Sequence, residues 1–209
     1  MALIKQKMTP PEVVAVDERK KLRDFDGLCE ELNSDDPKAR RWAVRDLLTH
    51  ENASTPLVAR LKTETVTSVR TAILDALAGL CDEVSIAGLV ECLRSDDAAL
   101  RNEAIDVLKT VPDQVSLIIN SLLNDEDSDV RIFAVNILES LRHQDVEKWL
   151  IEVIEKDEHI NVCATAVDLL SEVGTELAVK PLENLKNRFA SEPYICFTVD
   201  LALKRIKGD

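Results

Sequence analysis

The sequence has few of the residues that build β-sheet proteins. Among 209 residues there are 5 glycines and 7 prolines, and aromatic residues make up only 3%. A sandwich or barrel needs frequent turn residues and strands rich in β-branched or aromatic side chains, so this composition argues against both. Ala, Leu, Val, Glu, Asp and Arg recur at helical spacing instead. The sequence therefore predicts an all-α fold.

Long apolar runs are also missing. No stretch approaches the roughly 20 apolar residues that a membrane-spanning helix needs. The first eight residues, Met1 to Met8, do not form the apolar run of a signal peptide. We therefore expect a cytoplasmic protein that does not insert into a membrane.

Basic residues are in deficit. The chain has 26 Lys and Arg against 39 Asp and Glu, which gives a formal net charge of −13. A surface that follows a phosphate backbone needs clustered Lys and Arg, so we expect no nucleic-acid partner. A partner protein with a basic or mixed surface fits this charge better. An acidic surface that serves only solubility fits it as well.

The residues that usually carry chemistry are scarce and scattered. None of the five cysteines belongs to a Cys-x-x-Cys pair, and Cys29, Cys92 and Cys163 fall at or beside apolar positions, which predicts reduced, buried thiols. The only histidines are His50, His143 and His159, interpreted here as solvated turn residues. No Gly-rich phosphate loop and no Gly-x-Ser-x-Gly motif occurs. We predict no catalytic residue, no metal site and no cofactor, and hence a protein that is not an enzyme.

The dominant positive feature is an internal repeat. In residues Leu123 to Leu138 an acidic turn is followed by Val130-Arg131, and the arginine opens an apolar helix. Equivalent arginines are spaced by 30, 31 and 30 residues, and two further units carry other residues at that position. The six anchor positions are Arg40, Arg70, Arg101, Arg131, Cys163 and Ile195. Such a period is typical of stacked supersecondary units.

Each unit predicts two helices. Apolar residues at offsets −1, +3, +4, +7 and +10 from the anchor define one face of a helix with 3.6 residues per turn, here called helix B. A shorter apolar helix, helix A, precedes the acidic turn, as in Leu57-Val58-x-x-Leu61. A single hairpin cannot bury its own apolar face, so stacking of neighbours completes the core.

The repeat also predicts the organisation of the chain. Residues 1–22 do not follow the pattern, and Thr9-Pro10-Pro11 opposes a helix there, so we expect an extended or partly helical tail. An array of about six units then occupies residues 23–209. The predicted units are 24–53, 54–83, 84–112, 113–144, 145–174 and 175–209.

The repeated residues resemble a known family. Leu93 to Leu108 reads Leu-x-x-Asp-Asp-x-x-Leu-Arg-x-x-Ala-Ile-x-x-Leu, which resembles the HEAT repeat in the short bacterial form known from phycobilisome lyases. Thr55-Pro56-Leu57 and Lys180-Pro181-Leu182 are similar to the proline-containing first helix of that repeat. The resemblance covers residues 24–207 and is strongest in the first four units. It implies an α-α superhelix, or α-solenoid, of the armadillo type.

The resemblance also implies roles for the turn residues. Asp and Arg of each turn form a ladder that ties neighbouring units together, since an Asp can cap a helix and an Arg can bridge to the next turn. The ladder residues are Asp36, Arg40, Arg70, Asp97, Arg101, Asp127 and Arg131. The last two units lack the arginine, which leaves the ladder open there. Some relatives with di-iron sites carry repeated His-Glu pairs, and this chain has one such dipeptide, His50-Glu51.

The outward side of the B helices is the candidate binding surface, and in this architecture it lines the concave side. Offset +5 places an acidic-leaning column there, and offset +2 contributes two aromatic residues. The candidate partner-binding residues are Trp42, Arg45, Asp75, Glu103, Asp106, Ile132, Phe133, Asn136 and Asp168. A plain solvated face is the alternative for the acidic column. Trp42 packing under the tail, or Phe133 filling a gap between units, are the alternatives for the aromatics.

Three functions follow as hypotheses. The first is a non-catalytic scaffold or adaptor that binds another protein on the concave face. The second, implied by the resemblance, is an accessory subunit of a chromophore (bilin) lyase system. The third is a HEAT-like protein that binds DNA bases, which the net charge of −13 disfavours. Self-association is compatible with the first.

Overall fold

The computed structural model describes residues 24–208, so the predicted tail of residues 1–22 lies outside it. Within this range the chain forms twelve α-helices and no β-strand. The helices are α1 (Phe25–Glu31), α2 (Pro37–Leu47), α3 (Ser54–Leu61), α4 (Thr67–Leu80), α5 (Glu83–Cys92), α6 (Ala98–Leu108), α7 (Pro112–Leu123), α8 (Ser128–Leu138), α9 (Val146–Lys156), α10 (Ile160–Val173), α11 (Glu176–Arg188) and α12 (Pro193–Lys207). None of these helices combines the length and apolar character needed to cross a membrane.

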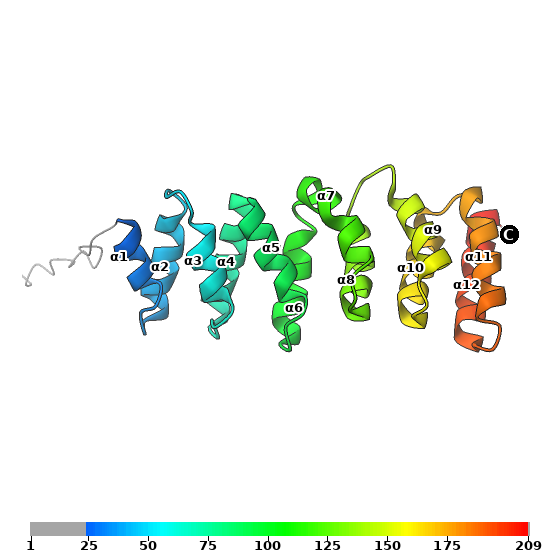
Figure 1. The fold of residues 1–209 in the computed structure, drawn as a ribbon, viewed down its shortest axis with the longest axis horizontal. Coiled ribbons are helices and arrows are strands. Elements are labelled where there is room, and N and C mark those ends of the chain that lie inside the picture. The colour runs from blue at the N-terminus through cyan, green and yellow to red at the C-terminus, as the bar shows by residue number, and fades with distance from the viewer. Residues whose placement is uncertain (1–23, 209) are drawn as a thin grey trace, which may run out of the picture.

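The helices follow one another along the long axis of an elongated array (Figure 1). Each odd-numbered helix packs against the even-numbered helix that follows it, and each even-numbered helix also packs against the next even-numbered one. The odd-numbered helices are helices A of the repeat, and the even-numbered ones are helices B. The predicted all-α solenoid is therefore confirmed.

The acidic turn residues begin the B helices by capping them. Carboxylates of Asp36, Asp97 and Asp127 accept hydrogen bonds from backbone N–H groups in the first turns of α2, α6 and α8. Such caps satisfy donors that have no partner inside the helix. Helix α3 differs: it begins at Ser54, and no side chain caps its first turn. The Ser54 hydroxyl donates instead to Asp82, the cap of α5.

The core lies between the two layers of helices, where the repeat pattern places it. Residues three, four and seven after each anchor are buried in the first five units, which confirms the predicted register. These residues are Ala43, Val44, Leu47, Ile73, Leu74, Leu77, Ala104, Ile105, Leu108, Ala134, Val135, Leu138, Ala166, Val167 and Leu170. Offset +10 is less regular, since Leu141 is buried whereas Val173 is exposed.

One close contact between A helices depends on a glycine. A Cβ added at Gly88 of α5 would lie 2.4 Å from Cγ2 of Val58 on α3. Val58 has a stiff, β-branched side chain that cannot easily move aside. Gly88 therefore allows α3 and α5 to approach closely.

The cysteines are free thiols. Cys92 and Cys163 are buried as predicted, whereas Cys29 is only half-buried. Desolvation by burial raises the pKa of the Cys92 thiol to about 11 and also raises that of Cys163. Both residues therefore remain protonated at neutral pH.

Candidate functional site

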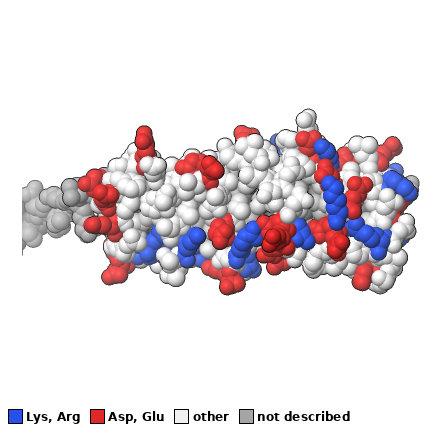
Figure 2. Space-filling view, viewed as in Figure 1, with Lys and Arg blue, Asp and Glu red and all other residues white. Residues whose placement is uncertain are grey.

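The turns that join helix A to helix B lie along one edge of the array, where basic and acidic side chains alternate (Figure 2). At the first interface between units, the Arg40 guanidinium donates to both carboxylate oxygens of Glu64, at 2.7 and 2.8 Å. It also donates to the carbonyl of Ser34 in its own turn, at 2.8 Å. The Glu64 side chain is 0% exposed and that of Arg40 is 6% exposed. A buried pair thus joins the first two units.

The buried carboxylate of Glu64 is held in its charged form. Burial opposes ionisation, but hydrogen bonds from Arg40, the Val66 N–H and Arg60 outweigh it, and the pKa of Glu64 falls to about 2. The Arg40–Glu64 hydrogen bond also raises the pKa of Arg40. This contact is charged throughout the physiological pH range.

At the second interface the arginine reaches two acids of the next unit. Arg70 donates to Glu103 at 2.7 and 3.0 Å, and to Asp97 at 2.9 Å. Glu103 was predicted to face a partner, but the structure places it in this contact between units. Its offset of +2 lies on the flank of α6 that meets α4, so the Arg70 side chain can reach it.

The third interface departs from the predicted ladder. Arg101 donates to the Ser95 carbonyl of its own turn, and its guanidinium carbon lies 6.0 Å from the centroid of the Phe133 ring. It belongs to none of the ion pairs formed among residues 24–208. Arg94 makes the ionic contact instead, donating to both oxygens of Asp125. Phe133 thus packs under a cation from the neighbouring unit.

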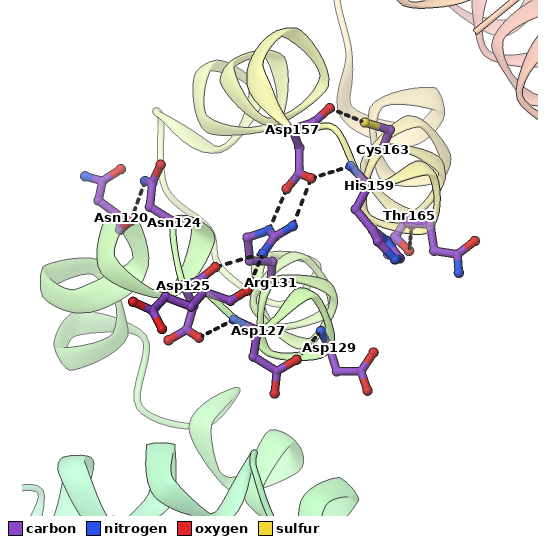
Figure 3. A network of polar contacts seen from close by, with 12 residues as sticks. Asn120, Asn124, Asp125, Asp127, Asp129, Arg131, Asp157, His159, Cys163 and Thr165 are labelled. Atoms are coloured by element: carbon purple, nitrogen blue, oxygen red, sulfur yellow. Dashed lines mark hydrogen bonds and ion pairs between the residues drawn. The ribbon is translucent and has the colours of Figure 1, made fainter.

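The fourth interface repeats the design of the first (Figure 3). Arg131 donates to both carboxylate oxygens of Asp157, at 2.7 and 3.1 Å, and to the Asp125 carbonyl of its own turn, at 2.8 Å. The backbone N–H of His159 donates to the same Asp157 carboxylate at 2.8 Å. Asp157 therefore links α8 to the start of α10.

At the fifth interface the anchor arginine is missing, and an arginine of the following unit takes its place. Cys163 occupies the anchor position and donates to the Asp157 carbonyl at 3.2 Å. Arg188, at the end of α11, donates to the carbonyls of Ile154, Glu155 and Asp157 at 2.9, 2.7 and 2.8 Å. These carbonyls lie at the C-terminal end of α9, where a cation is favourable. Sequence analysis missed Arg188 because it lies outside the repeated arginine position.

Two grooves of opposite charge lie on the surface of the even-numbered helices. The basic groove, of ≈ 400 Å³, lies between α2 and α4 and is lined by Arg41, Trp42, Val44, Arg45, Leu48, Ser68, Thr71, Ala72, Asp75 and Ala76. The acidic groove, of ≈ 230 Å³, lies between α8 and α10 and is lined by Val135, Asn136, Glu139, Thr165, Asp168, Leu169 and Glu172. The basic groove brings together the predicted residues Trp42, Arg45 and Asp75. The acidic groove brings together Asn136 and Asp168.

A family model for HEAT repeats matches residues 25–109 and 115–190. The chain belongs to the HEAT-repeat family. None of the curated proteins compared with it is significantly similar in sequence.

Several solved structures resemble this HEAT-repeat chain in fold. An engineered protein of the Northeast Structural Genomics Consortium is 20% identical, with a TM-score of 0.40 over 87% of this chain and 95% of that one. The complex of CpcE and CpcF of phycocyanin lyase from Nostoc sp. PCC7120 is 17% identical, with a TM-score of 0.37 over 97% and 91%. A designed armadillo repeat protein is 18% identical, with a TM-score of 0.40 over 88% and 100%. These likenesses concern the fold alone.

The charges on the two surfaces of the HEAT-repeat array differ in how they are used. The turn arginines bond to acids or carbonyls of the protein itself, as described above. In contrast, the side chains of Arg41, Arg45, Asp75, Asp106 and Asp168 make no hydrogen bond or ion pair with another residue in the range 24–208. The even-numbered helices therefore present charge that the described fold does not neutralise.

The remaining candidate residues lie on or beside the same surface. Asp106 is exposed on α6, whereas Ile132 and Phe133 of α8 are half-buried. Trp42 is also half-buried, and the Lys38 ammonium lies 5.3 Å from its ring centroid. Asp200 occupies offset +5 of the last unit, the position of the acidic-leaning column. Its carboxylate accepts hydrogen bonds from Lys186 at 2.5 and 2.7 Å.

Desolvation affects one carboxylate of the acidic groove, that of Asp168, although the residue is exposed. Desolvation raises the pKa of Asp168 above its ordinary value. Asp168 has no cationic neighbour within hydrogen-bonding distance in the described range. A positive group that entered the acidic groove would therefore stabilise the charged form.

Two of the three histidines, His50 and His159, are less exposed than expected. His143 stacks on Trp149 with ring centroids 4.9 Å apart, and the buried Nδ1 of His159 makes no hydrogen bond in the described structure. His50 is half-buried and lies 6.1 Å from the Phe25 ring. His143 is exposed in the loop between α8 and α9, as expected, whereas the interpretation of His50 and His159 as solvated turn residues is wrong. Within residues 24–208, no three His, Cys, Asp or Glu side chains converge as a set of metal ligands.

Arg188 offers a direct test of the fifth interface. Because Arg188→Ala removes three hydrogen bonds from a cation to the end of α9, we expect the free energy of unfolding to fall by about 1–2 kcal/mol. Hydrogen exchange should quicken mainly in α11 and α12, measured by mass spectrometry. Lys180→Ala removes an exposed cation whose ion pair, with Glu183, lies within the same helix, and should change neither quantity. Equal effects of the two substitutions would mean that Arg188 does not join the last two units.

Proposed function

We propose that this HEAT-repeat protein is a non-catalytic scaffold that binds a partner protein on the surface of its even-numbered helices. The contrast between the two kinds of charge carries the proposal. Three of the four turn arginines bond to acids of the next unit. In contrast, Arg45, Asp75 and Asp106 on the even-numbered helices have no partner in the described range. Unpaired surface charges steer association and select partners.

The mixture of groups on this surface favours a protein as the partner. The basic groove combines charged residues with the apolar side chains of Val44 and Leu48. Aromatic residues beside charges are typical of the centres of protein interfaces, and Trp42 and Phe133 lie on this side of the array. A net charge of −13 disfavours nucleic acid.

The proposal is tested by reversing charge on this surface. The double variant Asp106→Lys/Asp168→Lys should reduce recovery of the native partner at least about tenfold, because it puts cations where unpaired acids of the surface face basic groups of the partner. Recovery is measured by affinity capture from the native lysate with quantitative mass spectrometry. A partner retained by wild type and lost by the double variant identifies the binding surface.

A matched control separates this surface from the rest of the molecule. Glu91 and Glu155 are exposed on α5 and α9, both odd-numbered helices. Glu91→Lys/Glu155→Lys makes the same change in net charge and should leave recovery unchanged. Recovery that is equal for both double variants would contradict the assignment of the even-numbered helices.

A further inference from the structure

The basic groove is built to hold an acidic and partly apolar segment. Arg41 and Arg45 line it from α2, and Asp75 lines it from α4. Val44, Leu48, Ala72 and Ala76 supply the apolar part of its lining. Because neither arginine bonds to a carboxylate in the described range, both can donate to acids of a ligand. The apolar lining provides a place for a neighbouring large side chain of that ligand.

The acidic groove has the opposite preference. Its three acids are Glu139, Asp168 and Glu172, and it has no basic lining residue. Glu139 is paired with Lys109 at 3.0 Å, while Asp168 and Glu172 have no cationic partner within the described residues. Asn136, in the same groove, has an amide that can bond to a peptide backbone. Lys or Arg side chains fit this lining.

The spacing of the two grooves suits one extended chain. The basic groove lies between α2 and α4 and the acidic groove between α8 and α10, so three helix-to-helix steps separate them. Neighbouring packed helices lie about 8–10 Å apart, which places the groove centres about 24–30 Å from one another. An extended peptide covers this span with about eight residues, at about 3.3 Å per residue.

We propose that the surface of the even-numbered helices binds an extended peptide segment with an acidic block and a basic block separated by about eight residues. The acidic block, which includes one large apolar side chain, lies in the basic groove. The basic block lies in the acidic groove. This inference rests on the proposed function and deepens it, because it gives the partner a charge pattern, a length and a place on the array for each block.

The first test measures binding of synthetic peptides to the full chain by fluorescence anisotropy at about 0.1 M salt, where exposed charges more than about 10 Å apart are screened. The probe carries four Glu and one Leu, a neutral eight-residue spacer of Ser and Thr, and four Lys, and is made in both chain directions. One control has the same composition with alternating charges, and another has a two-residue spacer. The better of the two directions should bind at least about tenfold more tightly than either control, because only it engages both grooves at once.

The second test reverses the charge of each groove and asks whether the groove then prefers a peptide block of the opposite charge. Arg41→Glu/Arg45→Glu should lose the two-block peptide and gain affinity for a peptide with Lys blocks at both ends. Asp168→Lys/Glu172→Lys should gain affinity for a peptide with Glu blocks at both ends. Each variant is expected to gain at least about tenfold for its new peptide. A gain in binding cannot result from misfolding, so the variants report on charge complementarity.

Two results would overturn the inference: equal affinity for the two-block and alternating peptides, or variants that do not change their peptide preference. Glu91→Lys/Glu155→Lys should bind the two-block peptide as wild type does, and a loss there would also contradict the assignment. The capture experiment with Asp106→Lys/Asp168→Lys tests the proposed function separately. If that variant loses the native partner while the peptides show no preference, the surface binds a protein but not as an extended two-block segment.

Discussion

Replacement of Glu64 by alanine is expected to lower the free energy of unfolding by about 3–5 kcal/mol. The Glu64 carboxylate is 0% exposed and bonds to Arg40, Arg60 and the Val66 N–H. Its removal leaves the buried Arg40 guanidinium with backbone carbonyls as its only described partners. Breaking a buried ion pair is costly because the remaining charge stays out of water. Urea denaturation followed by circular dichroism measures the loss.

The second interface supplies a matched control. Glu103→Ala removes a carboxylate that is 29% exposed, and Arg70 keeps its contact with Asp97 at 2.9 Å. We expect a loss of about 1 kcal/mol or less. Arg40→Met/Glu64→Leu, which replaces both charges with apolar groups, should recover most of the stability lost in Glu64→Ala. Similar losses for Glu64→Ala and Glu103→Ala would show that burial does not set the strength of these pairs.

The same pair makes stability depend on pH in a defined direction. The pKa of Glu64 is lowered from 4.5 to about 2 in the folded protein. A lowered pKa means that the folded state binds fewer protons than the unfolded state, so the stabilisation is complete above about pH 4.5 and is lost as the pH falls towards 2. The difference in stability between wild type and Glu64→Ala should therefore shrink over this range. A difference that stays constant would contradict the role of the ionised carboxylate.

The fold could be predicted because the units of the array pack against their neighbours in the same way. Positions such as Ala104 and Leu108 meet the same neighbours in each unit, so the period of the apolar residues revealed both the helices and their buried face. The arginines could be found for the same reason. Their acidic partners could not, because Glu64 lies 24 residues after Arg40 whereas Glu103 lies 33 residues after Arg70. Partner choice depends on side-chain reach, which varies between interfaces.

The candidate surface was predicted in part. Helical periodicity placed Arg45, Asp75 and Asp106 on the outward side, and the structure leaves all three exposed. The sequence suggested one acidic-leaning column, whereas packing of α2 against α4 brings Arg41 into a basic groove at one end. Which flanks of adjacent helices face each other depends on their rotation about the helix axis, and this is set by the whole interface. A single sequence does not reveal that rotation.

The apolar core gives the second large expected effect. Leu138 of α8 is 1% exposed and Leu108 of α6 is 0% exposed, and both occupy the repeat position seven residues after the anchor. Leu138→Ala or Leu108→Ala should each lower the free energy of unfolding by about 2–5 kcal/mol, since each removes buried apolar surface and leaves a cavity. Urea denaturation measures this loss.

The location of the damage is as informative as its size. Each unit contacts mainly its neighbours, so Leu138→Ala should speed hydrogen exchange most in α7 to α10 and least in α2. Leu117 on α7 is 83% exposed, and Leu117→Ala should change stability by less than about 0.5 kcal/mol. If Leu138→Ala were as mild as Leu117→Ala, the buried face of α8 would be wrongly assigned. The outward positions of Phe133 and Asn136 would then be wrong as well, because all of these residues share one helical register.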